Sequence, residues 1–94
     1  MSGRTNEIAE IREKLSADNP GNRAAGILNL VRRGISEPDL VEPLVNDTEP
    51  FMFGMPVLVL ANAFMQLIGI MRYEGPYTHM VDAAEEDFRK EWHA

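Results

Sequence analysis

The chain has 94 residues, no cysteine, and fifteen acidic residues against nine Lys and Arg, which gives a net charge of −6. One domain with a single core is expected at this length, and disulfides, thiolate–zinc sites and thiol nucleophiles are excluded. A surface this acidic repels phosphate groups, so non-specific binding to nucleic acid is disfavoured.

The N-terminal segment is expected to form a flexible tail at residues 1–4, followed by a short amphipathic helix at about 6–17. Thr5 is the predicted N-cap, because its hydroxyl can accept a hydrogen bond from a free backbone N–H. The polar start of the chain lacks the apolar core of a signal peptide, so we expect a cytoplasmic protein. The apolar stripe of this helix has helical spacing and consists of Ile8, Ile11 and Leu15.

A second helix is predicted at about 20–33. Asn19 can cap it, and Pro20 suits its first position, where the missing N–H would have no partner within the helix. Gly34 follows the last turn and can adopt the positive φ with which many helices end. The apolar stripe consists of Ala24, Ile27, Leu28 and Val31.

A third helix is predicted to have Ser36 as its N-cap and to end at Asn46-Asp47. Pro43 lies inside it, and proline lacks a backbone donor and crowds the preceding turn. We therefore expect this helix to be short or bent. Its apolar side consists of Leu40, Val41, Leu44 and Val45.

The most apolar part of the chain follows Pro50. It begins with a cluster that has no clear periodicity and consists of Phe51, Met52, Phe53 and Met55. Pro56 is expected to separate this cluster from a helix at about 57–73. All residues from 57 to 71 are apolar except Asn62, Gln66 and Gly69. Such a helix has to be covered by protein on most of its circumference.

A fifth helix is predicted at about 78–92, after a break at Glu74-Gly75-Pro76 and with Thr78 as its N-cap. The ion pairs Glu85–Arg89 and Glu86–Lys90 are expected on its outer face. Its apolar stripe consists of Met80, Val81, Ala84, Phe88 and Trp92. No segment of the chain alternates between apolar and polar residues as a strand would, so we predict no strand.

Together these elements predict an all-α fold, in which residues 1–94 form one compact bundle of about five helices around the central apolar helix. The middle of the chain, at about residues 18–75, also resembles a HEAT-type helical repeat. The segments that carry the resemblance are Asn19-Pro20-Gly21-Asn22-Arg23 with Gly26 and Leu30, then Leu40-Val41-Glu42-Pro43-Leu44, then Ala61 with Leu67-Ile68-Gly69.

The chain departs from the HEAT pattern at two places. Gly26 replaces the usual alanine, and Phe51-Met52-Phe53 stands in the second unit, which has no arginine at the expected place. The resemblance implies a helical-hairpin arrangement and a protein-binding scaffold without chemistry of its own.

Catalytic, nucleotide-binding and metal-binding motifs are missing from the sequence, so we expect no enzyme activity, no cofactor and no bound metal. His79, Asp82 and Glu86 can share one helical face and hold a cation weakly. The favoured interpretation is a solvated first turn, with acids near the positive end of the helix dipole.

The residues predicted to bind a partner protein are Phe51, Met52, Phe53, Met55, Asn62, Gln66 and Trp92. The aromatic–methionine cluster is either a plug at the end of the bundle, which is favoured, or an exposed docking edge. The two amide side chains either form a buried contact between helices or across a dimer, or lie on the exposed side, which is favoured. Trp92 either docks the last helix or lies in a contact between chains.

The leading functional hypothesis is a non-enzymatic protein–protein interaction module, either a homodimer or a small regulator that binds one partner. A first alternative is a membrane-associated protein with residues 50–71 in the bilayer, since this uncharged stretch is long enough to span one. A second is an acidic mimic of nucleic acid that inhibits a DNA-binding protein. Its acidic cluster consists of Asp82, Glu85, Glu86, Asp87 and Glu91, interrupted by Arg89 and Lys90. The small size of the chain also suits a phage regulator.

Overall fold

The computed structural model of the chain describes residues 3–92, with side chains described from residue 6 onward. The fold is mostly helical and contains one small antiparallel sheet of two strands. In chain order the elements are α1 (Gly3–Leu15), α2 (Pro20–Arg33), α3 (Pro38–Val41), the 3₁₀ helix η1 (Glu42–Leu44), β1 (Pro50–Met52), β2 (Met55–Pro56), α4 (Val57–Leu67) and α5 (Thr78–Glu91).

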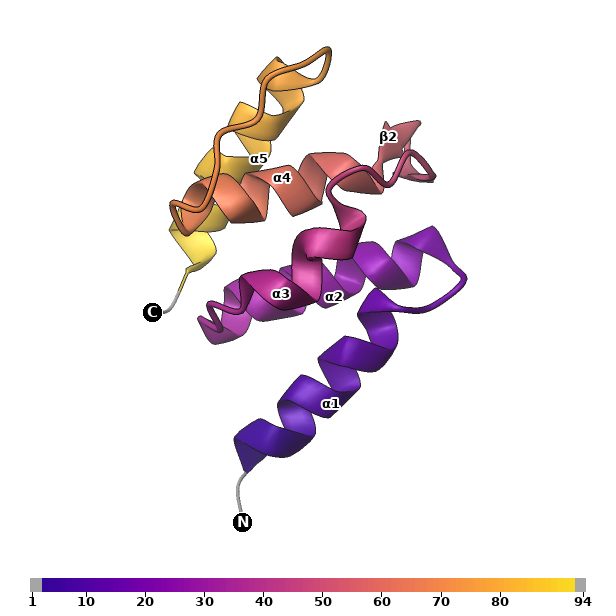
Figure 1. Ribbon diagram of the computed structural model, residues 1–94, viewed down its shortest axis with the longest axis vertical. Coiled ribbons are helices and arrows are strands. Elements are labelled where there is room, and N and C mark those ends of the chain that lie inside the picture. The colour runs from indigo at the N-terminus through magenta and orange to yellow at the C-terminus, as the bar shows by residue number, and fades with distance from the viewer. Residues whose placement is uncertain (1–2, 93–94) are drawn as a thin grey trace.

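The helices are stacked along the longest axis of the molecule, which measures 43 × 28 × 20 Å (Figure 1). In this stack α1 lies at one end and contacts α2, α3 contacts α1 and α4, and α4 lies between α2 and α5, which also contact each other at one edge. Each layer therefore buries its apolar side against its neighbours, and α4 is covered from two sides. The fully buried side chains at these contacts include Ile11, Ile27, Leu30, Val59 and Phe64.

The boundaries of α2 confirm the sequence-based prediction. The Asn19 side chain accepts hydrogen bonds from the backbone N–H groups of Gly21 and Asn22, at 2.6 and 3.3 Å. At the other end Gly34 has a φ of 64° and its N–H caps the helix. The backbone then turns so that Ile35 is buried. Local capping chemistry was therefore sufficient to place this helix.

Three other caps differ from the predictions. Helix α1 begins at Gly3, inside the expected tail, so Thr5 lies within the helix; Met1 and Ser2 lie outside the described residues. Helix α3 has Glu37 at its N-cap, not Ser36, and Thr78 is the first residue of α5. The Thr78 hydroxyl instead donates a hydrogen bond to the carbonyl oxygen of Gly75, at 2.8 Å.

Helix α4 is shorter than predicted. Every residue from Val57 to Gln66 is buried, but the helix ends at Leu67 rather than near Tyr73. Gly69, with a φ of 77°, reverses the backbone so that the N–H of Ile70 donates to the carbonyl oxygen of Met65 at 2.9 Å. A glycine that pays no steric cost for positive φ thus ends the helix, although the apolar composition continues.

The prediction that the chain has no strand is wrong. Strands β1 and β2 pair antiparallel, with Pro50 opposite Pro56 and Met52 opposite Met55. They are joined by a two-residue turn at Phe53 and Gly54 (Figure 1). Strands of three and two residues are too short for an alternation test, which needs about four to eight. We refer to residues 50–56 as the hairpin.

Candidate interaction surface

An open groove of about 400 Å³ lies where the hairpin meets α2, α4 and α5. Its apolar lining includes Leu28 from α2, Phe51 from the hairpin, Leu60 from α4 and Phe88 from α5. Three of the six methionines in the chain also line it, namely Met52, Met55 and Met80. Methionine is unbranched and polarisable, so such a lining can adapt to the shape of a bound apolar group.

The structure divides the predicted aromatic–methionine cluster between the core and the solvent. Phe51 and Met55 are half-buried and pack against the core, as the plug interpretation expects. Met52 is 56% exposed and Phe53 is 99% exposed, as the docking-edge interpretation expects. The cluster is therefore neither wholly a plug nor wholly exposed, and docking at Met52 and Phe53 stays a prediction.

Phe53 is held in an unusual backbone conformation. Its φ of 50° is the only positive φ of a non-glycine residue among the described part of the chain, and Gly54 next to it has a φ of 78°. Two successive positive φ values are typical of a tight type I′ hairpin turn, for which Asn-Gly is the preferred sequence. A bulky side chain at this position strains the backbone, and in this turn the Phe53 ring is exposed to solvent.

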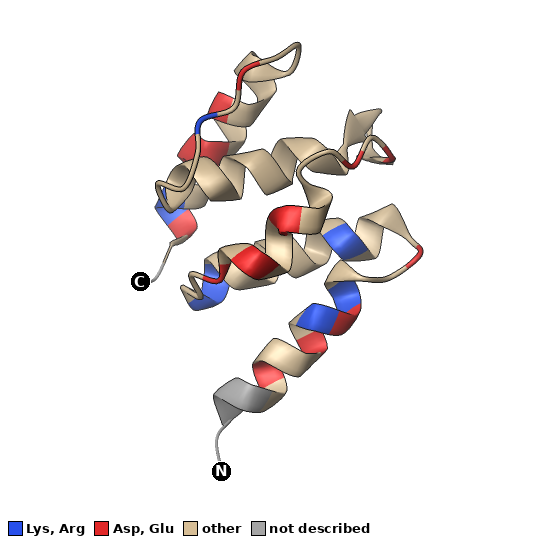
Figure 2. Cartoon of the chain, in the orientation of Figure 1, with Lys and Arg blue, Asp and Glu red and all other residues tan. Residues whose placement is uncertain are grey.

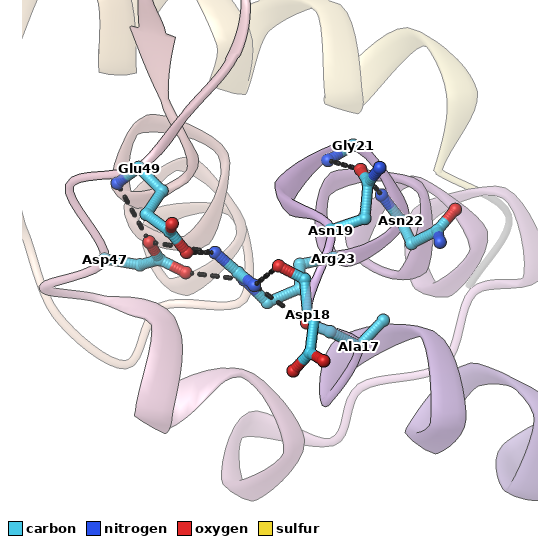
Figure 3. A network of polar contacts seen from close by, with 8 residues as sticks. All are labelled: Ala17, Asp18, Asn19, Gly21, Asn22, Arg23, Asp47 and Glu49. Carbon is cyan, nitrogen blue, oxygen red and sulfur yellow. Dashed lines mark hydrogen bonds and ion pairs between the residues drawn. The ribbon is translucent and has the colours of Figure 1, made fainter.

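The base of the hairpin is anchored by the buried guanidinium of Arg23 (Figure 3). Its Nε donates to Asp47 Oδ2 at 2.8 Å, and its Nη1 donates to the carbonyl oxygens of Ala17 and Asp18 at 2.7 and 2.9 Å. Its Nη2 also pairs with the Glu49 carboxylate. All of these partners lie in loops, so one side chain joins the α1–α2 connection to the segment before the hairpin.

The same network keeps Arg23 charged. Burial disfavours the charged guanidinium, but the hydrogen bonds to Asp47 and Glu49, together with the charges of both carboxylates, outweigh this penalty. The pKa of Arg23 is therefore raised above its ordinary value.

The two acidic partners of Arg23 also supply the N-terminal cap of α4. Pro56 occupies the N-cap position and makes no side-chain hydrogen bond. Instead the N–H groups of Val57 and Leu58 donate to the carbonyl oxygens of Glu49 and Asp47, at 2.9 and 2.8 Å. The free donors of the first helical turn are thus satisfied by the loop that Arg23 fixes. This role of Arg23 was not predicted from the sequence. The one available indication was its position, as a charged residue directly before the apolar stripe of α2.

Asn62 and Gln66 lie inside the protein rather than on an exposed stripe, so the favoured interpretation of these residues is wrong. Asn62 is 2% exposed, and its amide donates to the carbonyl oxygens of Val45 and Leu58 at 2.9 and 2.8 Å. Gln66 is 8% exposed and its amide donates to Glu85 at 2.6 Å. Its side-chain oxygen accepts from the N–H of Tyr73 at 2.8 Å. Both amides are thus used in contacts between elements of the same chain.

Trp92 directly follows α5 and packs on α4. Its ring is half-buried and meets the ring of Phe64 edge to face, with the ring centroids 6.3 Å apart. The structure therefore uses Trp92 to dock the last helix, which was one of its two predicted roles. Neither Trp92 nor the two amides line the groove, so among the predicted partner-binding residues only Phe51, Met52 and Met55 do so.

Acidic and basic residues both lie on α5 (Figure 2), and two of its acids form ion pairs within the chain. Glu85 pairs with Arg89, as predicted, and Glu91 pairs with Arg32 at 3.0 Å. No Glu86–Lys90 pair forms within residues 3–92. Over the same residues, no group of three or more His, Asp or Glu side chains is placed to hold a metal ion.

Residues 50–71, the stretch considered for a bilayer, are divided between the hairpin, α4 and a following turn. No described helix combines the length and the apolar character needed to cross a membrane.

Comparison with protein-family models, curated proteins and solved structures found no match to this chain.

Proposed function

We propose that this chain is a non-enzymatic protein–protein interaction module, a small helical regulator or adaptor. Its binding surface is the hairpin–groove surface, which we define as Met52 and Phe53 together with the groove beside them. The observation that carries the proposal is the side chain of Phe53, which is 99% exposed. It follows Met52, which lines an apolar groove.

Two physical arguments support this proposal. An aromatic side chain in water forgoes the free energy of burial, and aromatic anchors contribute most of the binding energy at many protein interfaces. The backbone around Phe53 adds a second cost, because its positive φ is unfavourable for a bulky residue. Neither feature stabilises the isolated chain. A partner that covers the Phe53 ring would gain the free energy of burying it.

The HEAT-like arrangement is part of the proposal. What supports it is the segment from Asn19 to Arg23, where the asparagine caps α2 and the arginine joins two loops. The layered stacking of helices also suits a repeat-type scaffold. The hairpin departs from that pattern, and it contains the exposed ring of Phe53. In this proposal the helices form the scaffold, with α4 as the central helix, and the hairpin lies at the edge of that scaffold.

The proposal can be tested by capture from an extract of the native host with tagged wild-type chain and two variants. Phe53→Ser removes the exposed ring without touching the core. Ile70→Ser is the matched control, because Ile70 is also exposed, at 56%, but does not line the groove. We expect one dominant partner that Ile70→Ser retains and Phe53→Ser loses.

A second copy of the chain is one candidate partner. Light scattering after gel filtration detects it as a mass that rises with concentration. If the chain stays monomeric and the extract yields no protein whose capture depends on Phe53, the proposed function is wrong.

A further inference from the structure

We infer that the hairpin–groove surface binds an amphipathic helix whose apolar side enters the groove and whose flanking residues are Lys or Arg. This inference rests on the proposed function, since it names the chemistry of the partner. It follows from three properties of the groove: its shape, its lining and its charge.

The groove runs along one face of α5. The residues of α5 that line it are Met80, Ala83, Ala84, Asp87, Phe88 and Glu91, which have the spacing of a single helical face. From Met80 to Glu91 this face is about 16 Å long, which corresponds to about three turns of a second helix. The alanines at its centre allow another backbone to approach closely.

A strand is a poorer occupant than a helix. Strands β1 and β2 have only three and two residues, so their edges provide few backbone groups for pairing with an added strand. An amphipathic helix instead offers apolar anchors at its i, i+3, i+4 and i+7 positions, and the methionine-rich lining can adjust to them.

The charge of the groove selects a basic helix. Asp87 and Glu91 line it, and its lining includes no Lys or Arg among the described residues. Glu91 is paired with Arg32, whereas Asp87 makes no ion pair within residues 3–92. A second copy would bring its own net charge of −6 to this acidic site. Charge complementarity therefore favours a basic partner over self-association.

The inference is tested with designed peptides of about 16 residues, enough for three turns or more of helix. The probe has Leu and Phe at helix-face positions and Lys elsewhere. One comparison peptide replaces every Lys with Glu, and the other is a scrambled sequence of the same composition. In fluorescence-anisotropy titrations we expect the probe to bind at least about tenfold more tightly than either comparison peptide.

Two matched pairs of variants locate the binding. Asp87→Lys and Glu86→Lys change the net charge equally, but only Asp87 lines the groove. Met52→Ser and Ile70→Ser remove side chains that are both 56% exposed, but only Met52 lines it. We expect Asp87→Lys and Met52→Ser to weaken binding of the probe by about tenfold or more, and their controls by less than about threefold.

A last variant separates binding from folding. Phe53→Asn creates the Asn-Gly turn that a type I′ hairpin prefers, and asparagine tolerates positive φ. We expect its Tm to rise by about 4 °C or more, while binding of the probe is reduced. If the variant is more stable and still binds the probe less tightly, misfolding cannot be the cause of the weaker binding.

The possible failures are distinguishable. If all three peptides bind equally, or each variant behaves as its control, the inference is wrong. The proposed function survives that result where a host protein is still captured in a Phe53-dependent manner. If the chain instead forms a dimer that Met52→Ser abolishes, the occupant of the groove is a second copy of the chain, and the inference that a basic helix binds there is overturned.

Discussion

At the scale of single residues, Arg23 is the side chain that joins the α1–α2 loop to the loop before the hairpin. We expect Arg23→Met to lower the free energy of unfolding by about 2–4 kcal/mol, because it leaves Asp47 and the carbonyl oxygens of Ala17 and Asp18 without their partner. Urea denaturation followed by far-UV circular dichroism measures this loss. The first turn of α4 should also fray, since its cap depends on the same loop.

Arg32→Met is the control for Arg23→Met. Arg32 also pairs with a carboxylate, that of Glu91, but the two side chains are 57% and 46% exposed. Exposed pairs contribute little, so we expect a loss under about 0.5 kcal/mol. Equal losses for the two variants would contradict the role of Arg23.

The raised pKa of Arg23 also determines how its contribution to stability depends on pH. This contribution is lost only as the pH rises through the pKa of Arg23 in the folded protein, so it stays constant at neutral pH.

At the scale of helices and strands, the sequence predicted those ends that local chemistry decides. Asn19, Pro20 and Gly34 act on neighbouring backbone groups, so their roles could be predicted from the sequence. The cap of α4 could not, because it consists of carbonyl groups from the loop that Arg23 anchors. Gly69 was an available signal for the end of α4, but the apolar residues on both sides of it favoured a longer helix.

The position of α5 depends on an aromatic contact at its end. We expect Trp92→Ala to lower the free energy of unfolding by about 1–3 kcal/mol, since it removes a half-buried ring and its edge-to-face contact with Phe64. Trp92 is the only tryptophan in the chain, so tryptophan fluorescence cannot follow the unfolding of this variant. Urea denaturation followed by circular dichroism measures the loss instead. Trp92→Phe should retain most of the stability. A loss below about 0.5 kcal/mol for the alanine variant would show that this contact does not hold α5.

At the scale of the whole molecule, the candidate site is assembled from elements that are distant in the sequence. Leu28, Met52, Leu60 and Met80 reach one groove from four different elements. The sequence indicated that Met52 belonged to an apolar cluster, but periodicity gave no information on which elements meet. Asn62 and Gln66 show the same limit, because their hydrogen-bond partners include Val45 just after η1, Tyr73 in the loop before α5 and Glu85 on α5.

Layered stacking also predicts how stability is distributed through the molecule. Helix α4 is covered by α2 on one side and α5 on the other, whereas α1 has neighbours on one side only. Amide hydrogen exchange reports local opening, and it should be slowest at residues 58–66 of α4 and fastest in α1. Residues 27–31 of α2, which lie between these layers, should be protected nearly as well as α4. If α1 exchanged as slowly as α4, the chain would open as a single unit, and the layers would have no separate stability.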